Sequence, residues 1–174
     1  MAGADPAYYW DTCLFLAWIK DEQRPSGEMD GVREVIARAK RRECKIITSA
    51  ITLVECLESK LPVGLDRLFK DMMKRVHRIS VDIKVADLAH DIRDYYTVRA
   101  QEYGGKKLTT PDAIHLATAI LYRAAEFHTF DDGGSDSKSI GLIGLSGNVG
   151  GHKLTICKPA AKNPGLDLRR PTRP

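Results

Sequence analysis

Short apolar segments alternate with longer segments of helical periodicity along most of this chain, and no other feature of the sequence restricts the fold as strongly. The periodicity predicts strands over residues 7–10, 45–48, 76–81, 127–130 and 153–157. It predicts helices over residues 12–20, 29–42, 50–60, 65–73, 84–103 and 110–124. Strands that alternate with helices build a mostly parallel sheet that is covered on both faces. The expected fold class is therefore α/β.

Residues with clear conformational preferences mark three of the helix ends. Ser49 suits the N-cap of the helix that follows the second strand, and Gly104 with Gly105 is expected to end the longest helix. Thr110 suits the cap of the last helix, because Pro111 then takes the first helical position.

The composition is that of a single soluble domain. Among 174 residues, 27 Lys and Arg stand against 23 Asp and Glu, which leaves a net charge of +4. The start of the chain lacks the basic segment of a secretory signal, and the four cysteines have no zinc-finger spacing. We therefore expect a reduced, cytoplasmic protein with one domain over residues 1–158. A Gly-rich, mobile loop is expected over residues 132–152, and the basic, Pro-rich residues 159–174 are expected to form an unpacked tail.

Four acidic residues fall where a parallel sheet would bring them to one edge. Asp11 directly follows the first expected strand, and Asp131 directly follows the fourth. Asp112 lies at the second position of the last helix, and Glu55 interrupts an apolar run after the second strand. Taken singly, the aspartates could be helix caps or acids that complement a helix dipole. Together they predict a site, because the functional crevice of such a sheet lies beyond the carboxyl ends of its strands.

Clustered carboxylates repel one another, and a hard divalent cation relieves that repulsion. Mg²⁺ and Mn²⁺ prefer oxygen ligands, and Mg²⁺ usually keeps several waters when it binds substrate phosphates. Such ions activate water and stabilise displacement at phosphorus. The four acids therefore predict metal-dependent hydrolysis of phosphodiester bonds.

Four segments of the chain resemble PIN domains, and above all the VapC-like ribonuclease toxins of type II toxin–antitoxin systems. They are DTCLFLAWI at Asp11, SAITLVECLE around Glu55, LTTPDAIHLATA at Asp112 and HTFDD at Asp131. The resemblance extends over about residues 7–132, and the motifs come in the family's order. It implies a three-layer α/β/α sandwich with a mostly parallel central sheet.

The resemblance also implies roles for particular residues and partners. Asp11, Asp112 and Asp131 would hold Mg²⁺ or Mn²⁺, Glu55 would join them in catalysis, and Thr129 would support the last acid. The implied substrate is single-stranded or structured RNA. An antitoxin protein and a second copy of the chain, in a homodimer, are the implied protein partners.

Two further features bear on this interpretation. Lys106 and Lys107 form a basic pair that could contact the RNA backbone, because phosphate contacts need cations rather than sequence readout. His115 lies three residues after Asp112 and is interpreted as a core or helix-surface histidine rather than a ligand.

The alternative function is that of a catalytically silent PIN domain that binds RNA or serves as a scaffold, which weak metal affinity would favour. A receiver-like or phosphatase fold is a third possibility for clustered acids. Receiver-like chemistry needs paired acids after the first strand and a lysine after a late strand, and the sequence has neither pattern.

Overall fold

The computed structural model describes residues 5–24, 27–57, 59, 61–134 and 137–161. Its centre is a five-stranded parallel sheet in the order β3-β2-β1-β4-β5. The strands are β1 (Ala7–Trp10), β2 (Lys45–Ser49), β3 (His77–Ile79), β4 (Glu126–His128) and β5 (Ile156–Cys157). The α-helices are α1 (Thr12–Ile19), α2 (Glu28–Lys40), α3 (Thr52–Glu55), α4 (Asp66–Met73), α5 (Ile83–Val98) and α6 (Thr110–Leu121), and two 3₁₀ helices are η3 (Ala100–Tyr103) and η4 (Leu142–Leu145). The expected α/β fold class is confirmed.

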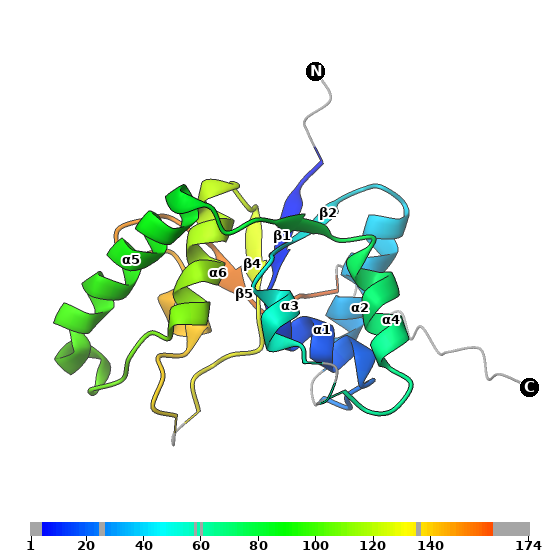
Figure 1. Ribbon diagram of the computed structural model, residues 1–174, viewed down its shortest axis with the longest axis horizontal. Coiled ribbons are helices and arrows are strands. Elements are labelled where there is room, and N and C mark those ends of the chain that lie inside the picture. Colours follow the sequence, from blue (N-terminus) through cyan, green and yellow to red (C-terminus); the bar gives the residue numbers. More distant parts are fainter. Residues whose placement is uncertain (1–4, 25–26, 58, 60, 135–136, 162–174) are drawn as a thin grey trace, which may run out of the picture.

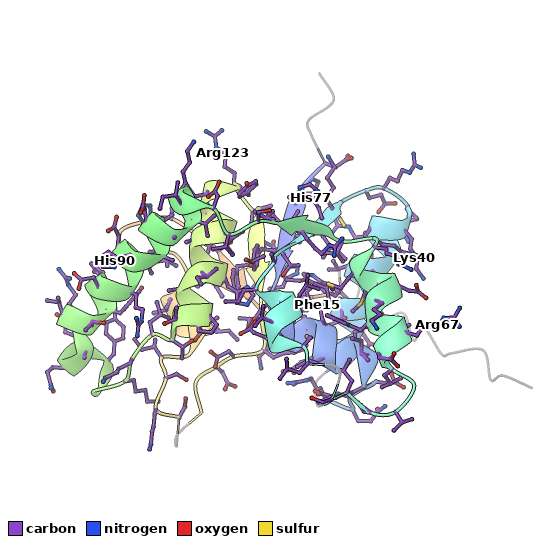
Figure 2. The ribbon with its side chains drawn as sticks, viewed as in Figure 1. Phe15, Lys40, Arg67, His77, His90 and Arg123 are labelled. Carbon is purple, nitrogen blue, oxygen red and sulfur yellow. The ribbon has the colours of Figure 1, made fainter. Side chains whose placement is uncertain are left out.

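Helices cover both faces of the sheet and give the molecule three layers (Figure 1). Helices α5 and α6 lie on one side, and α1, α2 and α4 lie on the other. The alternation of side chains along β1 explains this division. Tyr9 packs into the core beneath α5 and α6, whereas Tyr8 and Trp10 pack into the core beneath α1, α2 and α4. Figure 2 shows Phe15 inside the core beneath α1, α2 and α4, and Arg123 projecting outward beyond α6.

The helix expected over residues 50–60 is much shorter in the structure. Helix α3 ends at Glu55, because Cys56 has backbone angles (φ −85°, ψ 73°) outside the helical region. Its apolar side chains Leu53 and Val54 are 40% and 70% exposed. A short helix is stabilised mainly by burial of an apolar face, and α3 offers little of one.

Two of the expected caps are wrong by one or two residues. Ser49 is the last residue of β2, and the N-cap position of α3 belongs to Ile51. Thr109 rather than Thr110 caps α6, since Thr109 has an extended backbone (φ −74°, ψ 159°) and its hydroxyl accepts a backbone N–H of the first turn. Pro111 therefore takes the second helical position and not the first.

Other elements are shorter than expected. Helix α5 ends at Val98, and η3 continues the segment up to Gly104, whose positive φ of 64° ends it as predicted. Strands β3, β4 and β5 are all shorter than the predicted segments, and β4 ends at His128, two residues earlier. Among the described residues, none of the helices has the length and apolarity needed to cross a bilayer.

The prediction of a mobile, Gly-rich loop over residues 132–152 is wrong for its second half. Leu142, Leu145 and Val149 are almost completely buried in the core beneath α5 and α6. A side chain at Gly141 would lie 2.4 Å from the backbone of its neighbouring segment. The glycines thus allow a close approach of two backbones, so that the segment packs instead of moving freely.

The first residue of the expected tail is packed as well. Pro159 is buried, and a side chain at Gly31 of α2 would lie 1.9 Å from its carbonyl oxygen. Lys158 Nζ lies 2.7 Å from Glu28 Oε1 and holds the same segment to α2. Residues 162–174, which complete the expected tail, lie outside the described residues.

Candidate active site

Asp11 and Asp131 lie together where β1 and β4 end. The backbone N–H of Asp11 donates to the carbonyl of His128 at 3.1 Å, so the first acid remains in register with β4. Asp11 also caps α1, since its Oδ1 accepts the N–H of Thr12. The Thr129 hydroxyl donates to Asp11 Oδ2 at 2.8 Å and accepts the N–H of Asp131 at 3.0 Å. Thr129 therefore links the first and last acids.

Asp131 also organises the segment that follows it. Its Oδ1 accepts the N–H of Gly133 at 3.0 Å, and its Oδ2 accepts the N–H of Leu142 at 3.3 Å. Burial is the main cause that raises the pKa of Asp131, and the neighbouring charges of Asp11 and Asp132 add to it. The negative charge of this carboxylate is thus only partly compensated by its hydrogen bonds.

Asp112 reaches the same edge from the first turn of α6. Its backbone N–H and its carboxylate both contact the Thr109 hydroxyl. Burial, together with the charges of Asp11 and Asp131, raises the pKa of Asp112 to about 6. The hydrogen bond from Thr109 and the nearby ring of His115 oppose that rise. Three aspartates from separate segments therefore share one edge and repel one another there.

Glu55 joins this edge through His115 of α6. Nε2 of His115 lies 2.8 Å from Glu55 Oε2 and 3.8 Å from Asp11 Oδ1. The Thr12 hydroxyl donates to Glu55 Oε2 as well. Burial alone would raise the pKa of Glu55, but these hydrogen bonds and the His115 charge outweigh it and lower the pKa. Glu55 is therefore held as an ionised carboxylate.

His115 is completely buried, as expected of a core histidine, yet it also belongs to the site. Its Nδ1 lies 2.6 Å from the Tyr9 hydroxyl, and that hydroxyl accepts the N–H of Ser49 at 2.9 Å. Burial raises the pKa of Tyr9, so the phenol keeps its proton. Burial alone would lower the pKa of His115, but its hydrogen bond to Glu55 and the charges of Asp11, Glu55 and Asp112 raise it, so Nε2 carries a proton that it can donate to Glu55. In the sequence, the spacing of three residues between Asp112 and His115 was the signal that His115 could contact the site.

The acidic edge suits a hard cation by its chemistry. Its donors are carboxylate oxygens, and two of its aspartates have pKa values raised partly by mutual repulsion. Among the described residues, no three of these acids bring oxygens within 4.8 Å of one another. An ion bound to one or two carboxylates and to several waters fits this spacing, which is the usual manner of Mg²⁺.

A second group of metal-ligating side chains lies away from this edge. Glu126, His128 and Cys157 bring one ligand atom each within 4.8 Å of one another. His128 Nε2 is already paired with Glu126 Oε2 at 2.7 Å, and His128 Nδ1 is buried without a partner in the described part of the chain. Binding through Nε2 would force a proton onto that unpartnered nitrogen, so we interpret the pair as a structural contact of β4.

The two lysines of the expected basic pair differ in exposure. Lys106 Nζ lies 3.2 Å from the carbonyl oxygens of Gly133 and Gly134, and it thereby holds the start of the Gly-rich segment. Lys107 is exposed. Asp132 is exposed too, and its Oδ1 accepts the N–H of Gly134 at 3.4 Å.

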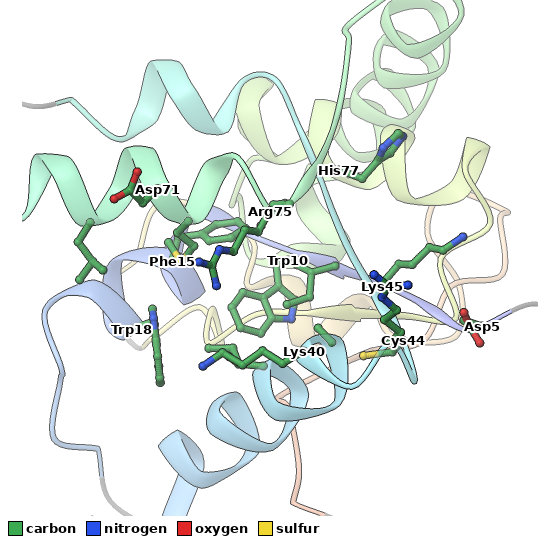
Figure 3. Close-up of a pocket in the computed structure, with 17 residues that line it drawn as sticks. Asp5, Trp10, Phe15, Trp18, Lys40, Cys44, Lys45, Asp71, Arg75 and His77 are labelled. Atoms are coloured by element: carbon green, nitrogen blue, oxygen red, sulfur yellow. The ribbon is translucent and has the colours of Figure 1, made fainter.

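A groove of about 790 Å³ lies on the other side of the sheet, between α2 and α4. None of the four acids lines it. Figure 3 shows Trp10 in the middle of the groove, with Lys40 and Arg75 on either side of it in this view. The apolar wall includes Leu68 and Met72 of α4. The groove is thus an apolar surface with a basic rim.

A protein-family model described as the PIN domain matches residues 8–136 of this chain. The chain belongs to the PIN-domain family. The parallel sheet with helices on both faces and the acids at its carboxyl edge therefore form a PIN domain, as the sequence motifs predicted.

Solved structures add similarity in fold. VapBC2 from Rickettsia felis, bound to a DNA fragment from its promoter, is 19% identical, with a TM-score of 0.55; the match covers 71% of this chain and 86% of that one. A toxin–antitoxin complex from Klebsiella pneumoniae is 19% identical with a TM-score of 0.49, over 88% of this chain and 98% of that one. FitAcB from Neisseria gonorrhoeae is 19% identical with a TM-score of 0.46, over 71% of this chain and 87% of that one. No curated protein matches the chain.

Proposed function

We propose that this PIN domain is a metal-dependent endoribonuclease that hydrolyses phosphodiester bonds of single-stranded or structured RNA. The observation that carries the proposal is the meeting of Asp11, Asp112 and Asp131 at one sheet edge, where the pKa of Asp112 rises to about 6. Such unrelieved negative charge is costly in the folded chain unless a cation binds to it. Membership of the PIN-domain family supports the same assignment.

In this proposal Asp11, Asp112 and Asp131 hold Mg²⁺ or Mn²⁺, with one or two of the carboxylates bound directly and the rest through waters of the ion. The ion, when bound, supplies an activated water and stabilises the charge that develops on the phosphate. Thr129 orients Asp11 through its hydrogen bond, and Glu55 faces the same edge as an ionised carboxylate. In the basic pair, Lys106 already contacts the carbonyl oxygens of Gly133 and Gly134. Lys107 is exposed and is therefore available to the RNA backbone.

Cleavage of labelled RNA and DNA oligonucleotides by the purified chain tests the proposal. We expect RNA fragments with Mg²⁺ or Mn²⁺ and none after EDTA is added. RNA that binds without being cut, whatever the metal, would contradict the proposal and favour the silent RNA-binding alternative. Metal-dependent cleavage of DNA alone would contradict the assigned substrate class.

Binding of Mn²⁺ should depend on pH around the pKa of Asp112, which is raised to about 6. A carboxyl group with a raised pKa is protonated below that pH, and its proton competes with the ion. We therefore expect the affinity to be constant above pH 7 and to fall by up to about tenfold per pH unit below pH 6. Calorimetric titration with Mn²⁺ at several pH values from below 6 to above 7 measures the affinity. An affinity that does not change over this pH range would contradict the prediction.

We propose further that the groove between α2 and α4 binds an antitoxin, in the manner of a toxin–antitoxin pair. The structural neighbour from Rickettsia felis is itself a VapBC pair. The rim carries the exposed cations Lys40, Arg42 and Arg75, and the charge of Asp71 in the same rim is paired with Lys74. An amphipathic helix with an apolar face and acidic flanks complements such a groove.

A further inference from the structure

His115 connects Glu55 to the sheet through a chain of buried hydrogen bonds. The N–H of Ser49 donates to the Tyr9 hydroxyl at 2.9 Å, and that oxygen lies 2.6 Å from His115 Nδ1. On the other side of the ring, Nε2 lies 2.8 Å from Glu55 Oε2. The chain therefore joins β2, β1, α6 and α3, whose residues are as far as 106 positions apart.

Both hydrogen bonds to Glu55 are made to the same oxygen. The Thr12 hydroxyl and His115 Nε2 contact Oε2, whereas Oε1 has no hydrogen-bond partner within the described part of the chain. The Glu55 side chain is 26% exposed. Each carboxylate oxygen can accept two hydrogen bonds, so the unused acceptor capacity of Glu55 lies on Oε1.

The groups that hold Oε2 cannot easily move. Tyr9 stacks on Phe127 with ring centroids 4.9 Å apart, and both rings are completely buried. His115 is also completely buried. If Glu55 rotated away, the Nε2 proton of His115 would lose its acceptor inside the core, which is unfavourable. The orientation of Glu55 is therefore set before any ligand arrives.

The charges of the acids divide into two groups. Glu55 Oε2 lies 2.8 Å from His115 Nε2, whereas Asp11 Oδ1 lies 3.8 Å from it and, within the described residues, Asp112 and Asp131 form no ion pair. The negative charge that a cation would neutralise is therefore that of the three aspartates. Direct contact with the ion would stabilise Glu55 less, because His115 already balances its charge.

We propose that Glu55 stands outside the coordination shell of the ion and orients the attacking water through Oε1, with His115, Thr12 and Tyr9 as positioning residues. This inference rests on the proposed nuclease function. The water oxygen forms the new bond to phosphorus, and the bond from phosphorus to the leaving oxygen of the nucleotide breaks. The leaving oxygen takes a proton from solvent, and the proton lost by the water passes along its hydrogen bond to Glu55 and from there to solvent.

The substitution His115→Leu, measured by kcat for RNA cleavage and by Mn²⁺ titration, separates this role from a role in metal binding. We expect kcat to fall about 10- to 100-fold, the usual effect of removing a group that orients a catalytic residue. The Mn²⁺ affinity should change by less than about threefold, since no ligand of the ion is altered. His115→Gln should restore most of kcat, because its amide N–H can reach Glu55 in place of Nε2.

The substitution Tyr96→Phe is the matched control. It removes the hydroxyl of a completely buried side chain, which donates to the carbonyl oxygen of Asn148 at 3.4 Å and accepts the N–H of Gly150 at 3.2 Å. It should leave kcat unchanged. If His115→Leu weakened Mn²⁺ binding as strongly as the loss of an aspartate, Glu55 would belong to the ion's shell and the inference would be wrong. It would also be wrong if His115→Leu and Tyr96→Phe had the same kcat.

The failure of the proposed function would look different. A wild-type chain that binds Mn²⁺ but cuts no RNA would overturn the nuclease proposal, and the role of Glu55 with it. A wild-type chain that cuts RNA while His115→Leu cuts it equally well would overturn only the inference on Glu55.

Discussion

Asp11→Asn is expected to reduce metal-dependent RNA cleavage by about 10³-fold or more, while the chain remains folded. The loss follows because the substitution removes a charge from the carboxylates that hold the ion, and such an ion contributes several kcal/mol of transition-state stabilisation. Single-turnover cleavage of labelled RNA at saturating Mn²⁺ measures it.

The fold should tolerate this substitution for local reasons. The single amide oxygen of an asparagine can still cap α1 by accepting the N–H of Thr12, and its NH₂ group can then donate to the Thr129 hydroxyl. Removing the charge also relieves part of the repulsion that raises the pKa of Asp112 to about 6. We therefore expect a melting temperature, without metal at neutral pH, equal to or above that of the wild type.

Asp132→Asn is the control for loss of charge alone. Asp132 is exposed and accepts one long hydrogen bond from Gly134, so its substitution should change cleavage little. Equal losses for Asp11→Asn and Asp132→Asn would mean that general electrostatics, and not an ion at Asp11, explains the effect. Full activity of Asp11→Asn would exclude the proposed metal site.

Leu68→Asp is expected to weaken binding of the antitoxin by about 30-fold or more. Leu68 lines the groove and is 45% exposed, so a charge there would be buried in the apolar interface without a partner. The stability of the free chain should hardly change, since the new charge remains in contact with water. Titration with a helical peptide that has an apolar face and acidic flanks measures the affinity.

Val98→Asp gives a matched change on the other side of the sheet. Val98 is 73% exposed at the end of α5 and does not line the groove. We expect the affinity for the antitoxin to be unaffected by it. A Leu68→Asp chain that binds normally, or a Val98→Asp chain that does not, would place the partner elsewhere than in the groove.

The order of strands and helices could be predicted from periodicity, because the burial of one face repeats over a few residues along the chain. The residues at which these helices and strands begin and end could not be predicted, because they depend on contacts with other segments. Helix α3 stops at Glu55 since little of it is buried, and Leu142 and Leu145 pack in a segment whose glycines suggested a mobile loop. Both errors arose because packing with distant segments, absent for α3 and present for Leu142 and Leu145, outweighed a local preference.

The convergence of Asp11, Asp112 and Asp131 was determined by the sequence itself, because residues that follow parallel strands or begin the next helix must gather at the carboxyl edge. Only the tertiary structure decided how Glu55 is held. His115 meets Glu55 across 60 positions and Tyr9 across 106, and these contacts depend on how closely α3, α6 and β1 approach in space. A local pattern contains no information on such an approach, so the buried hydrogen bonds that orient Glu55 became visible only in the fold.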